Sequence, residues 1–259
     1  MSEVSLEARS PRVQLWTIQG AERSNSLRRA LVQELAHKVA VADADRELRC
    51  VVITGAGDKA FCAGADLKER AGWTEGDVRE WLELLKRAFR GIEVSPKVFV
   101  AALNGAALGG GLELALACDL RVADPAAMLG APEVKLAIIP GAGGTQRLAR
   151  VVGIGRAKDL VLTGRRVPGP EALAMGLCSK LSAPGKTVEE ALALAEEIDE
   201  NGPAALAQAK RAIVDGFGMD IERALDLEIQ HYHRLLGTRD RLEGLAAWAE
   251  KRKPRYTGD

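Results

Sequence analysis

The chain lacks the features that mark several large classes of protein. No apolar run approaches the ~20 residues needed to cross a bilayer, so no membrane-spanning helix is expected. Basic and acidic residues balance at 36 each, which gives no net attraction to nucleic acid or to an anionic membrane surface. The first residues have neither the apolar core of a signal peptide nor an arginine-rich presequence. Together these absences predict a soluble, cytoplasmic protein.

Common catalytic and redox signatures are also absent. No serine lies in a G-x-S-x-G elbow, which removes the usual hydrolase interpretation. There is no C-x-x-C pair, and we expect reduced, buried thiols at four well-separated positions: Cys50, Cys62, Cys118 and Cys178. The histidines lack the spacing of a metal site and are predicted to be surface or interface residues: His37, His231 and His233.

One loose nucleotide-binding pattern is present. Residues 55–60 (GAGDKA) follow a predicted strand and satisfy G-x-G-x-x-[GA]. Such a motif should open a helix, whereas residues 61–64 continue as a turn. A nicotinamide site is therefore a minor alternative.

The first part of the chain alternates strands, turns and helices, which indicates an α/β fold. A hairpin is expected over residues 4–19, and residues 24–26 (SNS) offer caps for a helix over 27–43. Continuous apolar runs predict strands, buried on both faces, over residues 48–54 and 98–103, with the second leading directly into a glycine-led helix. The remaining expectations are a turn over 61–68, a helix over 73–94, and short strands over 120–123 and 128–129.

From about Thr145 the strand patterns stop and helical periodicity with Gly or Pro punctuation takes over. No linker rich in Ser, Pro or Gly separates the two parts, so two packed subdomains are expected, over residues 1–195 and 196–259. Helices are predicted over residues 148–153, 155–163, 170–176, 188–201, 203–216, 221–236 and 239–253.

The centre of the chain holds two carboxylates in apolar surroundings. Glu113 lies in the first turn of a helix led by three glycines and apolar on every face, although burying an unpaired carboxylate costs several kcal/mol. Glu133 follows a proline, and residues 141–144 (GAGG) form a second glycine-rich turn. Taken singly, each acid could simply stabilise a helix start. Taken together, they supply two acid/base groups beside unobstructed backbone N–H donors, as stabilising and protonating an enolate requires.

These segments resemble the enoyl-CoA hydratase/isomerase (crotonase) superfamily over essentially the whole chain. The motifs that carry the resemblance are residues 61–67 (FCAGADL), 104–113 (NGAALGGGLE), 132–133 (PE) and 139–148 (IPGAGGTQRL). The resemblance implies a crotonase-like spiral of ββα units and a C-terminal helical region that mediates trimerisation, usually within a hexamer. It also implies a coenzyme A thioester as substrate, with no metal or redox cofactor.

The resemblance assigns roles to particular residues. The N–H groups of Ala63 and Gly110 would form an oxyanion hole for the thioester carbonyl. Glu113 would activate water, Glu133 would deliver a proton to Cα, and the Gly141 N–H would help place the water. Both glutamates together are typical of hydratases, whereas isomerases keep one.

A narrower resemblance points to the 3-methylglutaconyl-CoA hydratases of leucine breakdown. It rests on residues 61–70, 112–123, 135–140 and 240–245. The substrate's distal carboxylate requires a cation, for which Arg70 and Lys135 are candidates, although either could be an ordinary surface charge. Further predicted substrate or coenzyme A contacts are Ala65, Asp66, Leu67, Lys68, Trp248 and Lys251, the last of these from a neighbouring subunit.

Two alternatives stay open. One is a hydratase for crotonyl-CoA or another short enoyl-CoA. The other is an RNA-binding protein with the same fold, because related animal hydratases bind AU-rich RNA through a lysine-studded helix. Residues 28–49 have a single lysine, Lys38, and four acids, so RNA binding is not expected: Glu34, Asp43, Asp45 and Glu47.

Overall fold

Two β-sheets form the frame of residues 3–259, the part of the chain that the computed structural model describes. The larger sheet contains, in spatial order, β1 (Val4–Ala8), β2 (Val13–Ile18), β3 (Cys50–Gly55), β5 (Val98–Leu103), β7 (Leu120–Ala123) and β10 (Lys180–Leu181). The smaller sheet contains β4 (Ala60–Cys62), β6 (Ala106–Leu108), β8 (Met128–Gly130) and β9 (Arg166–Pro168). All neighbouring strands are parallel except the β1–β2 hairpin and the β8–β9 pair.

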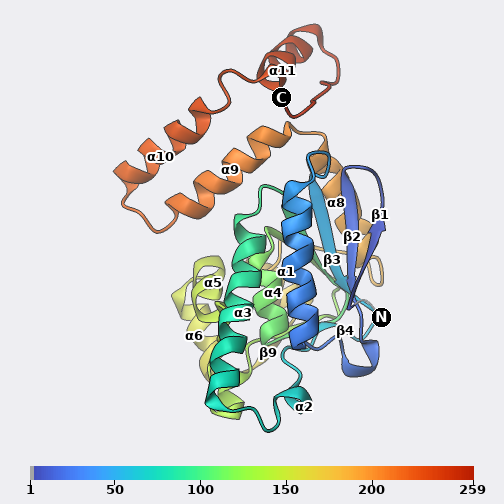
Figure 1. Cartoon of the computed structure of the whole chain (residues 1–259), viewed down its shortest axis with the longest axis vertical. Helices are drawn as coiled ribbons and strands as arrows, with labels where there is room; N and C mark the ends of the chain where they lie inside the picture. Colours follow the sequence, from blue (N-terminus) through green and yellow to red (C-terminus); the bar gives the residue numbers. More distant parts are fainter. Residues whose placement is uncertain (1–2) are drawn as a thin grey trace.

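Helices cover these sheets and make up most of the second half of the chain (Figure 1). They are α1 (Arg29–Ala44), α2 (Leu67–Arg70), α3 (Glu75–Val94), α4 (Gly110–Ala117), α5 (Gly144–Val152), α6 (Ile154–Thr163), α7 (Gly169–Ala174), α8 (Thr187–Asp199), α9 (Pro203–Gly216), α10 (Ile221–His233) and α11 (Arg239–Glu250). Two 3₁₀ turns, η1 (Ala21–Arg23) and η2 (Glu133–Leu136), interrupt the loops. None of these helices has the length and apolar character that crossing a bilayer needs.

The chain repeats one path through both sheets. It makes a strand in the larger sheet, then one in the smaller sheet, and then a helical segment. The strand pairs β3–β4, β5–β6 and β7–β8 follow this path, with α3, α4 and η2 after them. The predicted spiral of ββα units is therefore confirmed.

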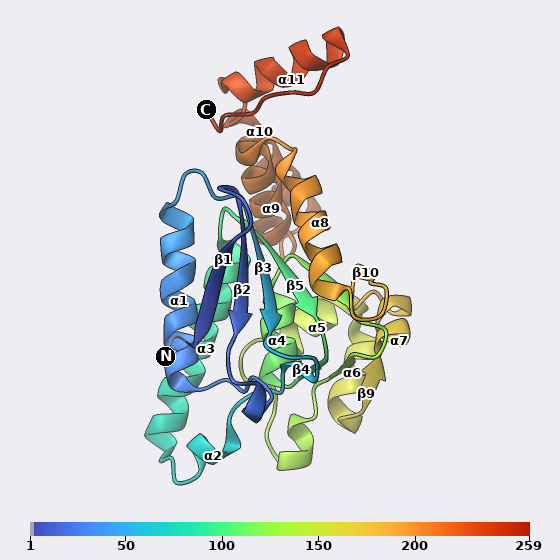
Figure 2. The same ribbon diagram turned by 90° about the vertical axis from the view of Figure 1, so that its right-hand side faces the viewer.

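Strand residues alternate between two cores. In β3, Val51 and Ile53 face a core shared with α1 and α3, whereas Cys50 and Val52 face α8. Both faces are covered, as Figure 2 shows with α1 and α3 on one side of the larger sheet and α8 on the other. This two-sided burial explains why β3 and β5 are continuous apolar runs.

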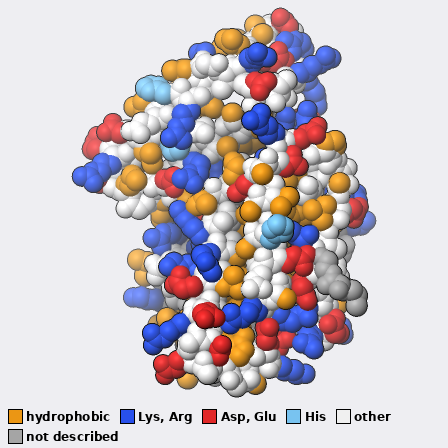
Figure 3. Space-filling model, in the orientation of Figure 1, with side chains coloured by type: hydrophobic (Ala, Val, Ile, Leu, Met, Phe, Trp, Pro, Cys, Tyr) orange, Lys and Arg blue, Asp and Glu red, His pale blue; other side chains and the backbone are white. Residues whose placement is uncertain are grey.

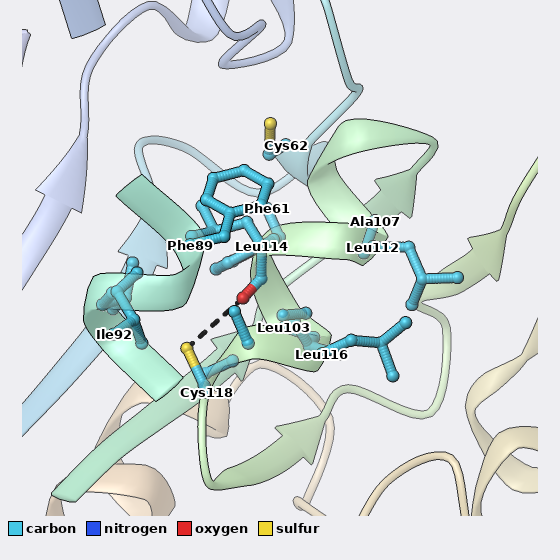
Figure 4. Close-up of a cluster of buried hydrophobic side chains, with 14 of the residues drawn as sticks. Phe61, Cys62, Phe89, Ile92, Leu103, Ala107, Leu112, Leu114, Leu116 and Cys118 are labelled. Atoms are coloured by element: carbon cyan, nitrogen blue, oxygen red, sulfur yellow. Dashed lines mark hydrogen bonds between the residues drawn. The ribbon is translucent and has the colours of Figure 1, made fainter. Parts of the chain in front are cut away.

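The helix α4 lies inside the larger core. Every residue from Gly111 to Ala117 is buried, which accounts for a helix apolar on all faces. Figure 4 shows Leu114 beside Phe61 and Phe89, and Cys118 at the helix end, where its thiol lies 3.6 Å from the Leu114 carbonyl. The expected burial of all four cysteine thiols is confirmed.

The helices α9, α10 and α11 extend beyond the sheets (Figure 1). Lys210 of α9 joins this region to the spiral, because its ammonium donates to Asp119 Oδ2 at 2.8 Å and to the Lys97 carbonyl at 2.8 Å. Arg49 makes a second link through the carbonyls of Asp199 and Tyr256, at 2.9 and 3.0 Å. The predicted boundary at residue 195 falls inside α8, whose face toward the sheet is part of the spiral's packing.

Several local predictions are wrong. Ser24 and Asn25 do not cap α1: both have positive φ, and α1 begins after Arg28 without a side-chain cap. The expected turn over residues 61–68 contains the end of β4 and the start of α2, and β6 separates β5 from α4. Strands do not stop at residue 145, because β9 and β10 complete the edges of the two sheets.

The histidines fit their prediction in part. His37 and His233 are exposed, whereas His231 is buried and its Nδ1 lies 2.8 Å from Gln208 Oε1, between α10 and α9. A packed, hydrogen-bonded histidine joins two helices here, which the helical pattern alone did not indicate.

Lys210→Met tests the link between the helical region and the spiral. The change leaves the mostly buried Asp119 carboxylate without its cation, which should lower the free energy of unfolding by about 3 kcal/mol. Urea denaturation measures the loss. Lys253→Met is the matched control, because its pair with Glu200 is exposed and should contribute under about 1 kcal/mol. Equal losses in the two variants would contradict this account.

Candidate active site

A cleft of about 750 Å³ lies at the start of α4. One wall comes from residues 63–70, another from α3, and a third from residues 132–141. The cleft brings Glu113, Glu133 and Gly110 together, although they come from different turns of the spiral. Its lining is otherwise mainly apolar, so charges inside it are poorly solvated.

Glu113 is buried and held by backbone donors. Its Oε1 accepts the N–H groups of Ala142 and Gly144, both at 2.7 Å. Burial raises the pKa of Glu113, although these two N–H groups and the charge of Arg147 oppose the shift. A Cβ on Gly144 would lie 2.9 Å from the same carboxylate oxygen, so the glycine permits this close approach. The carboxylate is therefore fixed in orientation with one oxygen free to act as a base.

Glu133 has the opposite surroundings. It begins η2, and its Oε2 is buried with no hydrogen-bond partner among residues 3–259. Burial raises the pKa of Glu133 to about 7; its own backbone N–H opposes the shift, and the nearby charge of Glu113 adds to it. Gly109 makes room for it, since a Cβ there would lie 3.0 Å from Glu133 Oε1. A carboxyl group of this kind can give or take a proton near neutral pH.

The predicted oxyanion donor Ala63 requires a correction. Its N–H already donates to the Ser24 carbonyl at 3.0 Å, so it is not free for a substrate. The N–H of Ala65 has no acceptor within residues 3–259, and that nitrogen lies 3.7 Å from the position a Cβ on Gly110 would take. Gly110 is the first residue of α4, where the N–H has no partner within the helix. The free pair of donors is thus Ala65 and Gly110.

The loop before α1 fixes this pair. The Leu27 N–H donates to the Gly64 carbonyl at 2.8 Å, and the Asp66 N–H donates to the Leu27 carbonyl at 3.0 Å. Leu27 and Ala65 thus form a parallel bridge, in which the Ala65 N–H points away from the loop that contains Leu27. Asn25, fully buried, holds the loop by donating to the carbonyls of Ala56 and Ala60. Its sequence signal pointed to a helix cap, but its role is to anchor this loop.

The other predicted contacts divide into two groups. Leu67, Arg70 and Gly141 line the cleft with Ala65. Asp66 does not point into it: the carboxylate caps α2 and also bonds Arg23. Burial opposes ionisation of Asp66, but these donors hold its pKa below the usual value.

Besides Asp66, four predicted residues do not line the cleft in the described chain. Lys68 is exposed on α2, and the Lys135 stem lies against Gly164. Trp248 is 82% exposed on α11, and Lys251 ends that helix in a left-handed conformation. Within one chain, α11 does not reach the cleft.

Most of the apolar wall of the cleft is not predicted from the sequence. α3 supplies four residues at helical spacing, Val78, Trp81, Leu82 and Leu85. That spacing signalled a buried helix face, and nothing in it separates cleft lining from core. Leu27 and residues 136–139 complete the wall.

No cluster of His, Cys, Asp or Glu side chains able to hold a metal ion occurs among residues 3–259. The expectation of a reaction without metal or redox cofactor stays a prediction.

Glu113→Gln should lower the pKa of Glu133 from about 7, because the variant removes the neighbouring negative charge. The pKa should stay above that of an ordinary glutamate, since burial is the larger cause. A ¹³C NMR titration of the Glu133 carboxyl group measures the shift. Glu83→Gln, on the exposed face of α3, is the control and should leave it unchanged. An unchanged Glu133 titration in Glu113→Gln would mean that the two carboxyl groups do not interact.

Comparison with known proteins identifies the family of the chain. A family model described as enoyl-CoA hydratase/isomerase matches residues 9–259. The Bacillus subtilis protein YngF is 47% identical over 244 residues, covering 94% of each chain. The human mitochondrial methylglutaconyl-CoA hydratase is 43% identical over 246 residues, covering 93% of this chain and 73% of that protein.

A solved structure is also similar to this chain in sequence and fold. The enoyl-CoA hydratase from Bacillus anthracis is 46% identical and superposes with a TM-score of 0.97, covering 99% of this chain and 100% of that chain. The resemblance drawn from the motifs is thereby confirmed over both sequence and fold. The chain belongs to the enoyl-CoA hydratase/isomerase family and has the crotonase fold.

Proposed function

We propose that the protein reversibly adds water across the α,β double bond of a short branched enoyl-CoA, with 3-methylglutaconyl-CoA as the preferred substrate. The observation that carries this proposal is the pair of unlike carboxyl groups in one cleft. Glu113 is oriented by two N–H donors, whereas Glu133 is unpaired with a pKa of about 7. Such a pair can hold water between a base and an acid.

The chain's own groups account for each step. The Ala65 and Gly110 N–H groups receive the thioester oxygen as negative charge develops on it, and the start of α4 favours that charge. Glu113 removes a proton from water, whose oxygen then bonds to Cβ. Glu133 delivers a proton to Cα, which discharges the enolate. Losing one N–H donor from such a site costs about 3 kcal/mol of transition-state stabilisation.

Arg70 is the proposed partner of the substrate's distal carboxylate. It is the one cation in the cleft lining among residues 3–259, whereas Lys135 points elsewhere. Its guanidinium lies 5.9 Å from the centre of the Trp73 ring, within reach of a cation–π contact. The similarity to the human methylglutaconyl-CoA hydratase supports the same substrate. A crotonyl-CoA hydratase is the second candidate, since the wall beyond Arg70 is apolar.

We also propose a homo-oligomer, a trimer or a hexamer of two trimers. The region α9–α11 exposes large apolar side chains that a single chain leaves uncovered: Ile213, Phe217, Ile221, Leu225, Ile229, Tyr232, Leu242, Leu245 and Trp248. A second copy would cover them and bring Trp248 and Lys251 toward a neighbour's acyl pocket and coenzyme A phosphates.

RNA binding is not part of the proposal. The single lysine of α1, Lys38, pairs with Glu34 on the same helix, and these are side chains of opposite charge on one face. The helix therefore presents no free row of cations to a phosphate backbone.

Glu113→Gln and Glu133→Gln should each reduce kcat for hydration by about 10²-fold or more, because each removes one proton-transfer group. Loss of absorbance of the enoyl thioester measures hydration, and circular dichroism checks that the fold survives. Near-normal hydration in either folded variant would exclude its proposed role.

Arg70→Met should raise KM for 3-methylglutaconyl-CoA by about 10-fold or more, since the distal carboxylate loses its cation. KM for crotonyl-CoA, which has no such group, should change by less than about twofold. The comparison of kcat/KM for both substrates in both proteins gives the result. A wild-type preference for crotonyl-CoA, or an equal effect of the variant on both, would favour the short-chain alternative.

A further inference from the structure

A thin turn of the chain separates the catalytic cleft from a second hollow. Gly141 lines both the cleft and an outer hollow of about 1,110 Å³ between α3, α5 and the α9–α10 loop. The next residues of this turn, Ala142 and Gly144, are the donors to Glu113. The position of Glu113 therefore depends on what holds the turn from its outer side.

Arg147 is the side chain that holds it. From the first turn of α5, its Nη1 donates to the Ala142 carbonyl at 2.8 Å. The guanidinium occupies the space beside Gly143 that a side chain would need, because a Cβ there would clash with Arg147 Nη1. One residue thus carries both contacts: the Ala142 N–H donates to Glu113, and the Ala142 carbonyl accepts from Arg147. A shift of the guanidinium would move the donor that orients the catalytic carboxylate.

Glu93, near the end of α3, fixes the guanidinium in turn. Arg147 Nη2 donates to Glu93 Oε2 at 2.8 Å and Nε donates to Oε1 at 3.2 Å, so the pair is bidentate. Both side chains are mostly shielded from solvent, at 14% and 25% exposure. Arg90 donates to the same carboxylate from α3 without reaching the turn. Lys and Arg side chains gather on this face beside α3 (Figure 3).

We propose that Arg147 and Glu93 are positioning residues for the catalytic base, acting through the backbone of Ala142. The inference rests on the proposed hydration reaction and names two residues that contact no substrate. Arg147 contributes geometry by holding the turn, and charge by favouring the ionised form of Glu113.

The charged groups around Glu113 set the sign of each expected shift. α5 presents Arg147, which lowers the pKa of Glu113; η2 presents Glu133; and α3 presents Glu93 behind Arg147. The strands β4 and β6, which also pack on α4, bear no charged side chain. As the base, Glu113 must be ionised, so it sets the acid limb of the kcat/KM profile. Removing Arg147 moves that limb to higher pH, and removing the Glu93 charge moves it to lower pH.

The test compares four variants by their pH profiles for the enoyl-CoA that the wild type hydrates. Arg147→Met should lower kcat by about 10- to 100-fold, with KM within about twofold and the acid limb shifted upward. Glu93→Gln should lower kcat less and shift the limb downward. Arg147→Lys should keep the limb near its wild-type pH but not restore kcat, because an ammonium cannot reproduce the bidentate fork. Arg150→Met is the control, one turn along α5, where the side chain contacts Gln146 and Phe217 instead of the turn.

Two outcomes would overturn the proposal. The first is a kcat for Arg147→Met equal to that of Arg150→Met. The second is an acid limb of the kcat/KM profile that does not move, or that moves in the same direction in Arg147→Met and in Glu93→Gln. General destabilisation would lower kcat without producing opposite shifts. If the wild type hydrates no enoyl-CoA, the proposed function fails instead. In that case a ¹³C NMR titration of the Glu113 carboxyl group, whose resonance is assigned with Glu113→Gln, still measures the opposite shifts in the pKa of Glu113. This measurement needs no turnover.

Discussion

The site depends on two short hydrogen bonds from Ala142 and Gly144 to one oxygen of Glu113. They connect α4, which is buried in the core, to the loop that leads into α5. Because α4 is buried on all sides from Gly111 to Ala117, the packed core fixes the position of the helix that carries Glu113. The two backbone N–H donors then fix the orientation of the Glu113 carboxylate on this rigid helix.

The unlike behaviour of the two glutamates follows from a difference in local partners. Both are shielded from water, but Glu113 receives two N–H donors from a separate turn and a nearby cation, whereas Glu133 receives its own backbone N–H and lies near a like charge. Desolvation is therefore less offset at Glu133 than at Glu113. Two glutamates can therefore act as base and acid because their surroundings differ, although their residue type is the same. The free N–H groups of Ala65 and Gly110 lie in the same cleft as the two glutamates. One site can therefore stabilise negative charge and transfer protons.

The sequence was a good guide wherever burial alone decides the structure. The apolar runs of β3 and β5, the buried helix α4 and the meeting of Glu113 with Glu133 were all predicted from residue patterns. It failed where distant segments decide. Ala63 and Ala65 are two residues apart in a small-residue segment, and only the bonds from the loop at 24–27 determine which N–H is free. The two- and three-residue strands β10 and β9 likewise exist because a neighbouring strand edge is there to pair with.

The unpaired oxygen of Glu133 has a consequence for stability. A buried carboxyl oxygen without a partner costs free energy that a well-packed apolar side chain at the same position would not. Gly109 adds to the cost, since its φ of 52° and missing side chain serve mainly to leave room for that carboxyl group. This part of the chain is therefore a compromise between stability and activity. Sequence changes that make the protein more robust should accumulate here first in copies released from the need to catalyse.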